Sequence, residues 1–67
     1  MLKIEVEQED GGRWIAEVPA LAGALSYGAT ETEARTRVAA LVYRIIADRL
    51  EHGEPVPVEA RDLFAPA

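Results

Sequence analysis

A chain of 67 residues has room for one domain, and a domain of this length buries roughly 60% of the surface that its unfolded form exposes. With no cysteine and a single histidine, the sequence excludes a disulfide framework, a thiolate metal site and a histidine cluster, so self-association is the remaining way to add stability. The net charge of -5 disfavours direct binding to nucleic acid and favours cationic partners.

Residues 2–18 predict a β-hairpin with one buried face. Residues 2–7 alternate strictly between apolar and charged side chains, which is the pattern of a strand with one side in the core. Asp10-Gly11-Gly12 is typical of a turn because glycine adopts positive φ at little cost, so residues 13–18 are expected to fold back antiparallel. The predicted inward positions are Leu2, Ile4 and Val6 in the first strand and Trp14, Ala16 and Val18 in the second.

A third strand and a long helix are expected next. Pro19 ends the second strand because proline has no N–H to donate to a sheet, and residues 23–27 suit a third strand of a meander. Thr30-Glu31-Thr32-Glu33 fits a capping box, which predicts a helix from Thr30 to His52. Gly53 stands where a left-handed C-terminal cap belongs.

The proline-rich residues 54–67 are predicted to be extended, with one short edge strand at residues 57–61. The predicted fold class is therefore α+β. It combines a three-stranded antiparallel sheet, one long helix, and a C-terminal extended segment or short strand.

The dimensions of the helix predict self-association. A helix of this length spans roughly 33 Å, whereas strands of about six residues span only about 20 Å. Apolar residues on its last turns would then lie beyond the sheet, and we expect a homodimer or homotetramer in which a second protomer covers them. The predicted interface residues are Tyr43, Ile46, Leu50, Val56, Val58 and Phe64.

The connection at residues 18–34 predicts a structural link and no reactive site. Gly23 and Gly28 match no phosphate-binding fingerprint, and Glu31 and Glu33 would repel a phosphate at the helix start. His52 is expected to complement the helix dipole, because it stands in the last turn of the predicted helix. No serine is predicted to lie beside it, which argues against acyl transfer. We therefore expect no enzyme activity, no catalytic residue, no metal and no cofactor. The acidic residues of the hairpin would also suit a two-metal nuclease, but a solvent-exposed strand face accounts for them.

The sequence also predicts a cytoplasmic protein. No apolar run approaches the roughly 20 residues that a membrane-spanning helix needs. The N-terminus alternates between apolar and charged residues and does not form a cationic leader followed by an apolar block. We therefore expect no membrane contact.

Three motifs, in this order and spacing, resemble one protein family. They are Gly12-x-Trp14-x-Ala16-x-Val18-Pro19-x-Leu21-x-Gly23, then Gly28-x-Thr30-x-x-Glu33-Ala34, and finally Gly53-Glu54-Pro55-x-Pro57. Together they resemble the HicB-like antitoxin domain of prokaryotes over about residues 2 to 57. The resemblance divides the chain into a HicB-like domain at residues 1–57 and a tail at residues 58–67, which is an edge strand or an oligomerisation arm.

The resemblance implies a partial RNase-H-like fold of the ββαβ type without the RNase H catalytic carboxylates. Members of the family bind and block HicA toxins, which are small basic mRNA interferases. The resemblance therefore implies an antitoxin-like module that neutralises a HicA-type toxin by direct binding. Glu5, Glu7 and Glu17, on the predicted uncovered face of the sheet, are the predicted toxin contacts.

Two further expectations concern partners. Full-length HicB-like antitoxins also carry a C-terminal DNA-binding domain, and this chain ends before one would fit, so we expect no direct nucleic-acid binding. The alternative function is that of an orphan HicB-like oligomer, which has lost its toxin and binds a small ligand or another protein.

Overall fold

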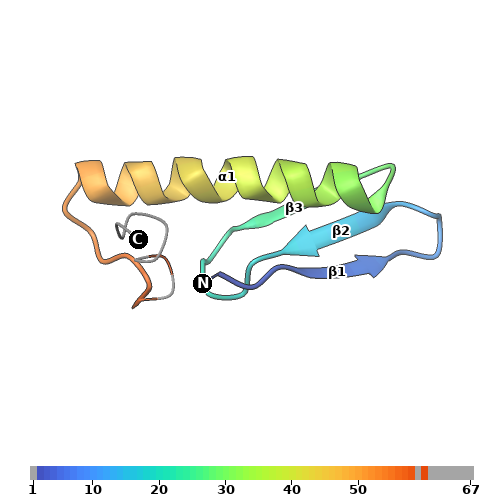
Figure 1. Cartoon of the computed structure of the whole chain (residues 1–67), viewed down its shortest axis with the longest axis horizontal. Helices are drawn as coiled ribbons and strands as arrows, with labels where there is room; N and C mark the ends of the chain where they lie inside the picture. The colour runs from blue at the N-terminus through green and yellow to red at the C-terminus, as the bar shows by residue number, and fades with distance from the viewer. Residues whose placement is uncertain (1, 59, 61–67) are drawn as a thin grey trace, which may run out of the picture.

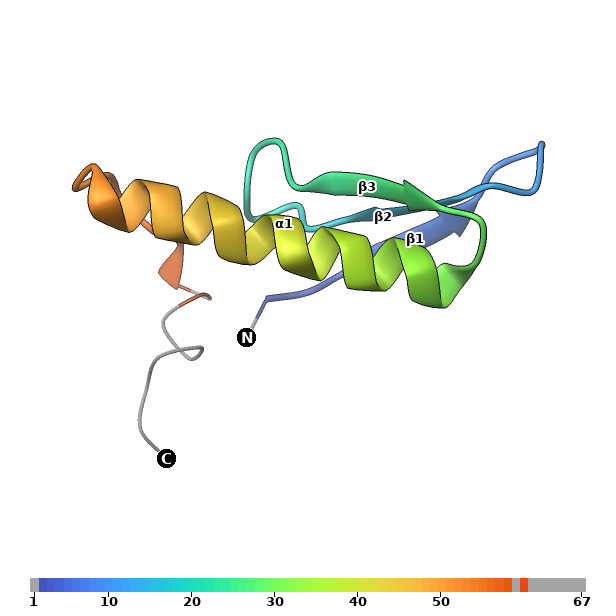
Figure 2. The same cartoon turned by 90° about the horizontal axis from the view of Figure 1, so that it is seen from above.

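The computed structural model describes residues 2–58 and 60 (Figure 1). In this part of the chain, the strands β1 (Glu5–Gln8), β2 (Trp14–Glu17) and β3 (Leu25–Gly28) form one antiparallel sheet in the order β1-β2-β3. The helix α1 (Glu31–Glu51) packs on one face of the sheet and crosses the strands obliquely when it is seen from above (Figure 2). The predicted α+β fold, with a three-stranded meander and one long helix, is confirmed.

The side-chain alternation predicted for the hairpin is observed. Val6 lies opposite Ala16 across β1 and β2, and Ala16 lies opposite Ser26 across β2 and β3. This row faces α1, and Ala16 and Val18 are buried in the core. The remaining predicted inward residues are half-buried and pack against the same core; they are Leu2, Ile4, Val6 and Trp14.

Both ends of α1 carry the predicted caps. Thr30 has an extended backbone, and its Oγ1 accepts a hydrogen bond of 3.1 Å from the Glu33 N–H. The Glu33 carboxylate, however, accepts from the Ala29 N–H at 3.3 Å, one residue earlier than a capping box requires. Gly53 has a φ of 67°, as expected of a left-handed cap.

The C-terminal cap of α1 is a Schellman motif. The Gly53 N–H donates to the Leu50 carbonyl at 3.3 Å, and the Glu54 N–H donates to the Arg49 carbonyl at 2.8 Å. These two bonds satisfy helix carbonyls that have no partner within the helix, and the chain then reverses direction. No helix in the described part of the chain combines the length and the apolar composition that a membrane span needs.

The N-terminal cap gives a first testable prediction. Thr30→Ala is expected to lower the free energy of unfolding by about 1 kcal/mol, because the Glu33 N–H loses its acceptor. Thr30→Ser should retain most of that stability. Urea denaturation of these variants can be compared with Thr32→Ala, which changes an exposed position in the first turn. Equal effects of the two alanine substitutions would show that the cap contributes nothing.

The connection between β2 and β3 closes one end of the core. The Leu21 N–H donates to the Val18 carbonyl at 3.0 Å, and the Val18 N–H donates to the Ala24 carbonyl at 2.9 Å. These bonds fold residues 18–24 into a compact turn that places the Leu21 side chain in the core, where it is 2% exposed. The connection therefore has the structural role that the sequence predicted.

One predicted interface residue belongs to the core of the single chain. Ile46 is 1% exposed and packs in the same cluster as Val42 and Ala60, so it has no free surface for a second protomer. Residues 54–58 run back beneath the C-terminal half of α1 (Figure 1). Val56 is half-buried there and packs against this cluster. Ile46 therefore needs no second protomer to cover it, and Val56 has only part of its surface available to one. Self-association of the chain stays a prediction.

Of the two predicted forms of the C-terminal segment, extended or a short strand at residues 57–61, no strand is observed in the described residues. Val58 and Ala60 lie in a single 3₁₀ turn, in which the Ala60 N–H donates to the Pro57 carbonyl at 2.9 Å. Pro55 and Pro57 have no N–H for a ladder, and burying Ala60 stabilises the turn. No strand follows α1 among the described residues, so the last strand of a ββαβ arrangement is not observed there. Residue 59 and residues 61–67, with Phe64, lie outside them.

Candidate functional site

The face of the sheet opposite α1 is the candidate site. No described helix or strand packs over this face (Figure 1). The strand register places two rows of side chains on it. The first row pairs Glu5 with Glu17 and Glu17 with Leu25, and the second pairs Glu7 with Ile15 and Ile15 with Tyr27. The sheet therefore brings the three predicted contact residues, Glu5, Glu7 and Glu17, to one face. We call this surface the open face.

The carboxylates on the open face are poorly compensated. Glu5 and Glu17 are exposed and stand directly opposite each other, an arrangement of like charges that destabilises a sheet. Among the described residues, the cation that pairs with one of these carboxylates is Lys3, whose Nζ lies 3.9 Å from Glu5 Oε2. Both side chains of that pair are largely exposed, so it adds little. The open face thus keeps a local negative field.

Apolar side chains lie beside these carboxylates. Ile15 is half-buried at the centre of the open face, and Leu25 and Tyr27 are 36% and 37% exposed along β3. The acidic residues and Ile15 line a shallow depression of about 360 Å³. Ile15, Leu25 and Tyr27 were not among the predicted site residues; the alternation that puts Glu17 on the solvent side also puts Ile15 there, and the pairing of β2 with β3 adds Leu25 and Tyr27. The site therefore combines charge with apolar surface.

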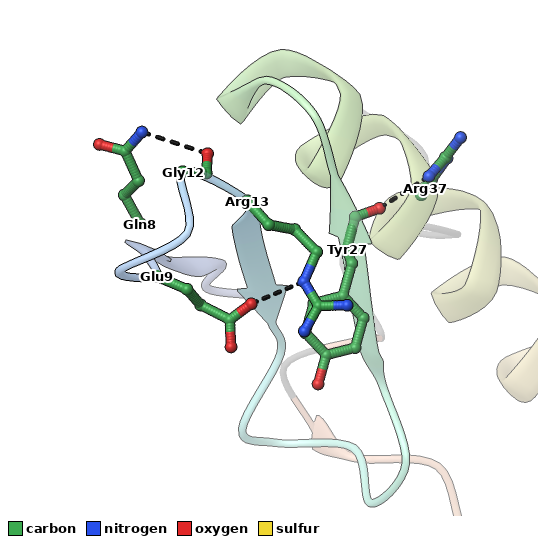
Figure 3. Close-up of polar contacts among 6 residues, drawn as sticks. All are labelled: Gln8, Glu9, Gly12, Arg13, Tyr27 and Arg37. Atoms are coloured by element: carbon green, nitrogen blue, oxygen red, sulfur yellow. Dashed lines mark hydrogen bonds and ion pairs between the residues drawn. The ribbon is translucent and has the colours of Figure 1, made fainter.

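One end of the open face is closed by a network at the hairpin tip (Figure 3). Arg13 Nε donates to Glu9 Oε1 at 2.7 Å, and the Arg13 guanidinium lies over the Tyr27 ring, 3.9 Å from its centroid. The hydrogen bond to Glu9 raises the pKa of Arg13 above its ordinary value, and desolvation partly opposes this rise. Gln8 Nε2 also donates to the Gly12 carbonyl at 3.2 Å. These contacts hold the hairpin tip against β3.

Arg37 ties the open sheet to the helix at the same end. Its guanidinium donates to the Tyr27 carbonyl at 3.0 Å and forms an ion pair of 3.0 Å with Glu33 (Figure 3). Because Arg13 and Arg37 each have a carboxylate partner, the two guanidinium groups do not form a free anion site. Their role is to position Tyr27 at the edge of the open face.

The helix start offers no phosphate cradle. The Glu33 N–H is taken by the Thr30 hydroxyl, and Gly28 is packed against the first turn so tightly that an added Cβ would lie 2.5 Å from the Ala34 nitrogen. Glu31 pairs with Arg35 at 2.8 Å. Gly28 is therefore required for close packing between β3 and α1, in agreement with the structural role predicted for this connection.

The C-terminal end of α1 gathers Asp48, His52 and Glu54, whose potential ligand atoms lie within 4.8 Å of one another. All three residues are exposed. His52 is the C-cap residue, and its Nδ1 lies 2.7 Å from the Asp48 carbonyl oxygen. A protonated Nδ1 donates to that carbonyl and complements the negative end of the helix dipole, which is the role predicted for His52.

No protein-family model, curated protein or solved structure matches this chain. The resemblance to HicB-like antitoxins consequently rests on the sequence motifs, and membership of that family stays a prediction. The geometry of the open face is an independent observation about what the protein can bind.

Proposed function

We propose that this protein is a HicB-like, non-enzymatic antitoxin module that acts in the cytoplasm by binding a small basic toxin of the HicA type. The observation that carries the proposal is the open face, on which Glu5, Glu7 and Glu17 lie around Ile15. Among the described residues, the exposed Lys3 is the one cation paired with any of these three carboxylates, since Arg13 at the hairpin tip pairs with Glu9. A cationic protein surface is the complement of such a face.

The two kinds of side chain on the open face have different roles in this proposal. The exposed carboxylates steer a cationic partner to the face and fix its orientation, and these effects weaken as salt concentration rises. Ile15, Leu25 and Tyr27 supply the apolar area that becomes buried in the complex. Because Glu5 lies opposite Glu17, a cation between them also relieves their mutual repulsion. Binding is therefore favoured by all three carboxylates together.

The test is co-purification with the product of an adjacent small open reading frame that encodes a basic protein. The triple variant Glu5→Lys, Glu7→Lys and Glu17→Lys is expected to weaken that association by at least about tenfold. The matched control is Asp48→Lys, Glu51→Lys and Glu54→Lys, which changes the net charge equally at the far end of α1. This control should change the affinity by less than about threefold, since distant surface charges are screened.

A second test measures RNA cleavage by the partner. The unmodified protein is expected to inhibit this cleavage, and the triple variant of Glu5, Glu7 and Glu17 is expected to lose the inhibition. Equal effects of the two triple variants would contradict a role for the open face. If no basic partner associates and a small ligand raises the melting temperature, the orphan-module function replaces the proposal. RNA cleavage by the purified protein alone with Mg²⁺, abolished by Glu5→Ala, would instead establish a nuclease.

A further inference from the structure

The outer edge of β1 continues into an extended segment whose backbone has no partner among the described residues. Leu2, Lys3 and Ile4 keep the alternating exposure of a strand, with Lys3 exposed and its two neighbours half-buried against the core. Within the described chain, these three residues take part in no strand pair and in none of the backbone hydrogen bonds outside the helix and strands. A row of unpaired N–H and C=O groups of this kind is a template for another strand.

The chain's own second strand does not supply that partner. Continuing the register from Glu5 and Glu17 would place Ile4 opposite Val18 and Lys3 opposite Pro19. The N–H and C=O groups of Val18 are both used inside the turn at residues 18–24, and Pro19 has no N–H. Among the described residues, the extended segment at residues 2–4 therefore has no backbone hydrogen-bond partner on either side.

The helix also leaves this part of the sheet incompletely covered. α1 packs mainly over β3 and β2 and touches β1 least. An apolar groove of about 140 Å³ remains between the extended segment and the helix, and it is lined by Leu2, Ile4, Val18, Ala39, Val42 and Tyr43. Tyr43, at the rim on α1, is 59% exposed. Figure 2 shows the described residues before β1 passing beside α1, with no labelled strand next to them.

We propose that a second copy of this chain pairs with this edge, so that the two β1 edges meet antiparallel about a two-fold axis at Ile4. The two sheets then form one continuous sheet with both helices on the same face. The grooves of the two copies adjoin, and each Tyr43 is covered by the apolar residues of the other copy. The proposed interface is therefore the β1 edge, and not the surface around Ile46 and Val56 that the sequence predicted. Tyr43 belongs to both interfaces.

The register follows from charge and from the two faces of the strand. With the two-fold axis at Ile4, Lys3 of each copy lies opposite Glu5 of the other copy. Two pairs of opposite charge therefore form on the open face. The same register places Leu2 opposite Val6 on the helix side. A shift by two residues in one direction sets Glu5 against Glu5, and in the other direction it sets Lys3 against Lys3. A shift by one residue sets apolar against charged side chains. This self-complementarity is why the occupant we propose is a second copy.

The first experiment is sedimentation equilibrium on the full chain. The unmodified protein is expected at twice the 7.3 kDa chain mass. Lys3→Glu should raise the dissociation constant by about tenfold or more, because both cross-strand pairs become repulsive. The exchange variant Lys3→Glu with Glu5→Lys should recover the affinity. Both positions are exposed, so folding is preserved, and Glu51→Lys is the control with no expected effect on mass.

The second experiment uses the absence of native cysteine. Directly opposed residues in an antiparallel pair have Cα atoms about 4.5–5.5 Å apart, within the range of a disulfide. Ile4→Cys should therefore form a covalent dimer on mild oxidation, and Leu50→Cys, on the exposed face of α1, should not.

Several results would overturn the proposed pairing. A monomer at concentrations of about 100 μM would exclude a specific dimer of useful affinity. This register would be excluded if Lys3→Glu dimerised with unchanged affinity. It would also be excluded if the double variant Lys3→Glu with Glu5→Lys did not recover the affinity. Faster cross-linking of Leu50→Cys than of Ile4→Cys would place the interface on the helix instead. None of these outcomes depends on toxin binding, because each is read from the mass of this chain alone.

Discussion

Ile46→Ala is expected to lower the free energy of unfolding by about 2–5 kcal/mol, the usual cost of removing a large aliphatic side chain from a core. Ile46 is 1% exposed and is one of the largest fully buried side chains in the described chain. The total free energy of unfolding of a domain this size is roughly 3–10 kcal/mol, at about 0.05–0.15 kcal/mol per residue. The substitution should therefore remove a large share of the stability.

Urea denaturation followed by circular dichroism measures this loss. Leu50→Ala is the matched control, because Leu50 lies on the same helix and is 56% exposed; its effect should stay within about 0.5 kcal/mol. Ile46→Glu should leave the chain largely unfolded, since it places an unpaired carboxylate in the core. If Ile46→Glu instead left the chain well folded, the observed burial of Ile46 would be wrong.

Gly28→Ala is expected to lower the free energy of unfolding by about 1–3 kcal/mol through overpacking. A Cβ at this position would lie 2.5 Å from the Ala34 nitrogen and 3.0 Å from the carbonyl carbon of Glu33. Both are backbone atoms in the first turn of α1, so β3 and the helix would have to move apart. The wider separation would also disturb the bond from Arg37 to the Tyr27 carbonyl, which is 3.0 Å long.

Gly11→Ala is the control for Gly28→Ala. An added Cβ at Gly11 meets no atom within 4 Å, and the backbone there does not have a positive φ. That substitution should be neutral or slightly stabilising, because alanine restricts the unfolded chain more than glycine does. Similar melting temperatures for the two variants would mean that β3 and α1 do not approach as closely as the structure indicates.

Local residue patterns predicted the three strands, the helix and the side of the hairpin that faces the core. Strict alternation at residues 2–7 identified which side of β1 faces the core, and Thr30 and Gly53 identified the ends of α1. These features follow from rules that act over a few residues: side chains alternate along a strand, and a helix end needs an acceptor or a positive φ. The groups that interact in these features lie within a few residues of one another, so the residue pattern is enough to predict them.

Part of the candidate site could be predicted in the same way. Alternation alone placed Glu5, Glu7 and Glu17 on the solvent side of the hairpin. That Glu5 stands opposite Glu17, and that Ile15 and Tyr27 join them, depended on the register of two strand pairs. Register is set by the turns and by the packing of the whole sheet, and one residue of slip would invert the face.

Local patterns did not predict which chain segment covers which apolar surface. Helix length and apolar composition correctly indicated that α1 extends beyond its sheet, but they did not say what lies beneath its last turns. The tail returns under Ile46 and places Ala60 in the core, whereas the groove beside Leu2 and Ile4 remains open. The hydrophobic effect is proportional to area and has no direction, so a sequence reveals how much apolar surface must be covered. Which surface covers it depends on the path of the chain, and that path is a property of the complete fold.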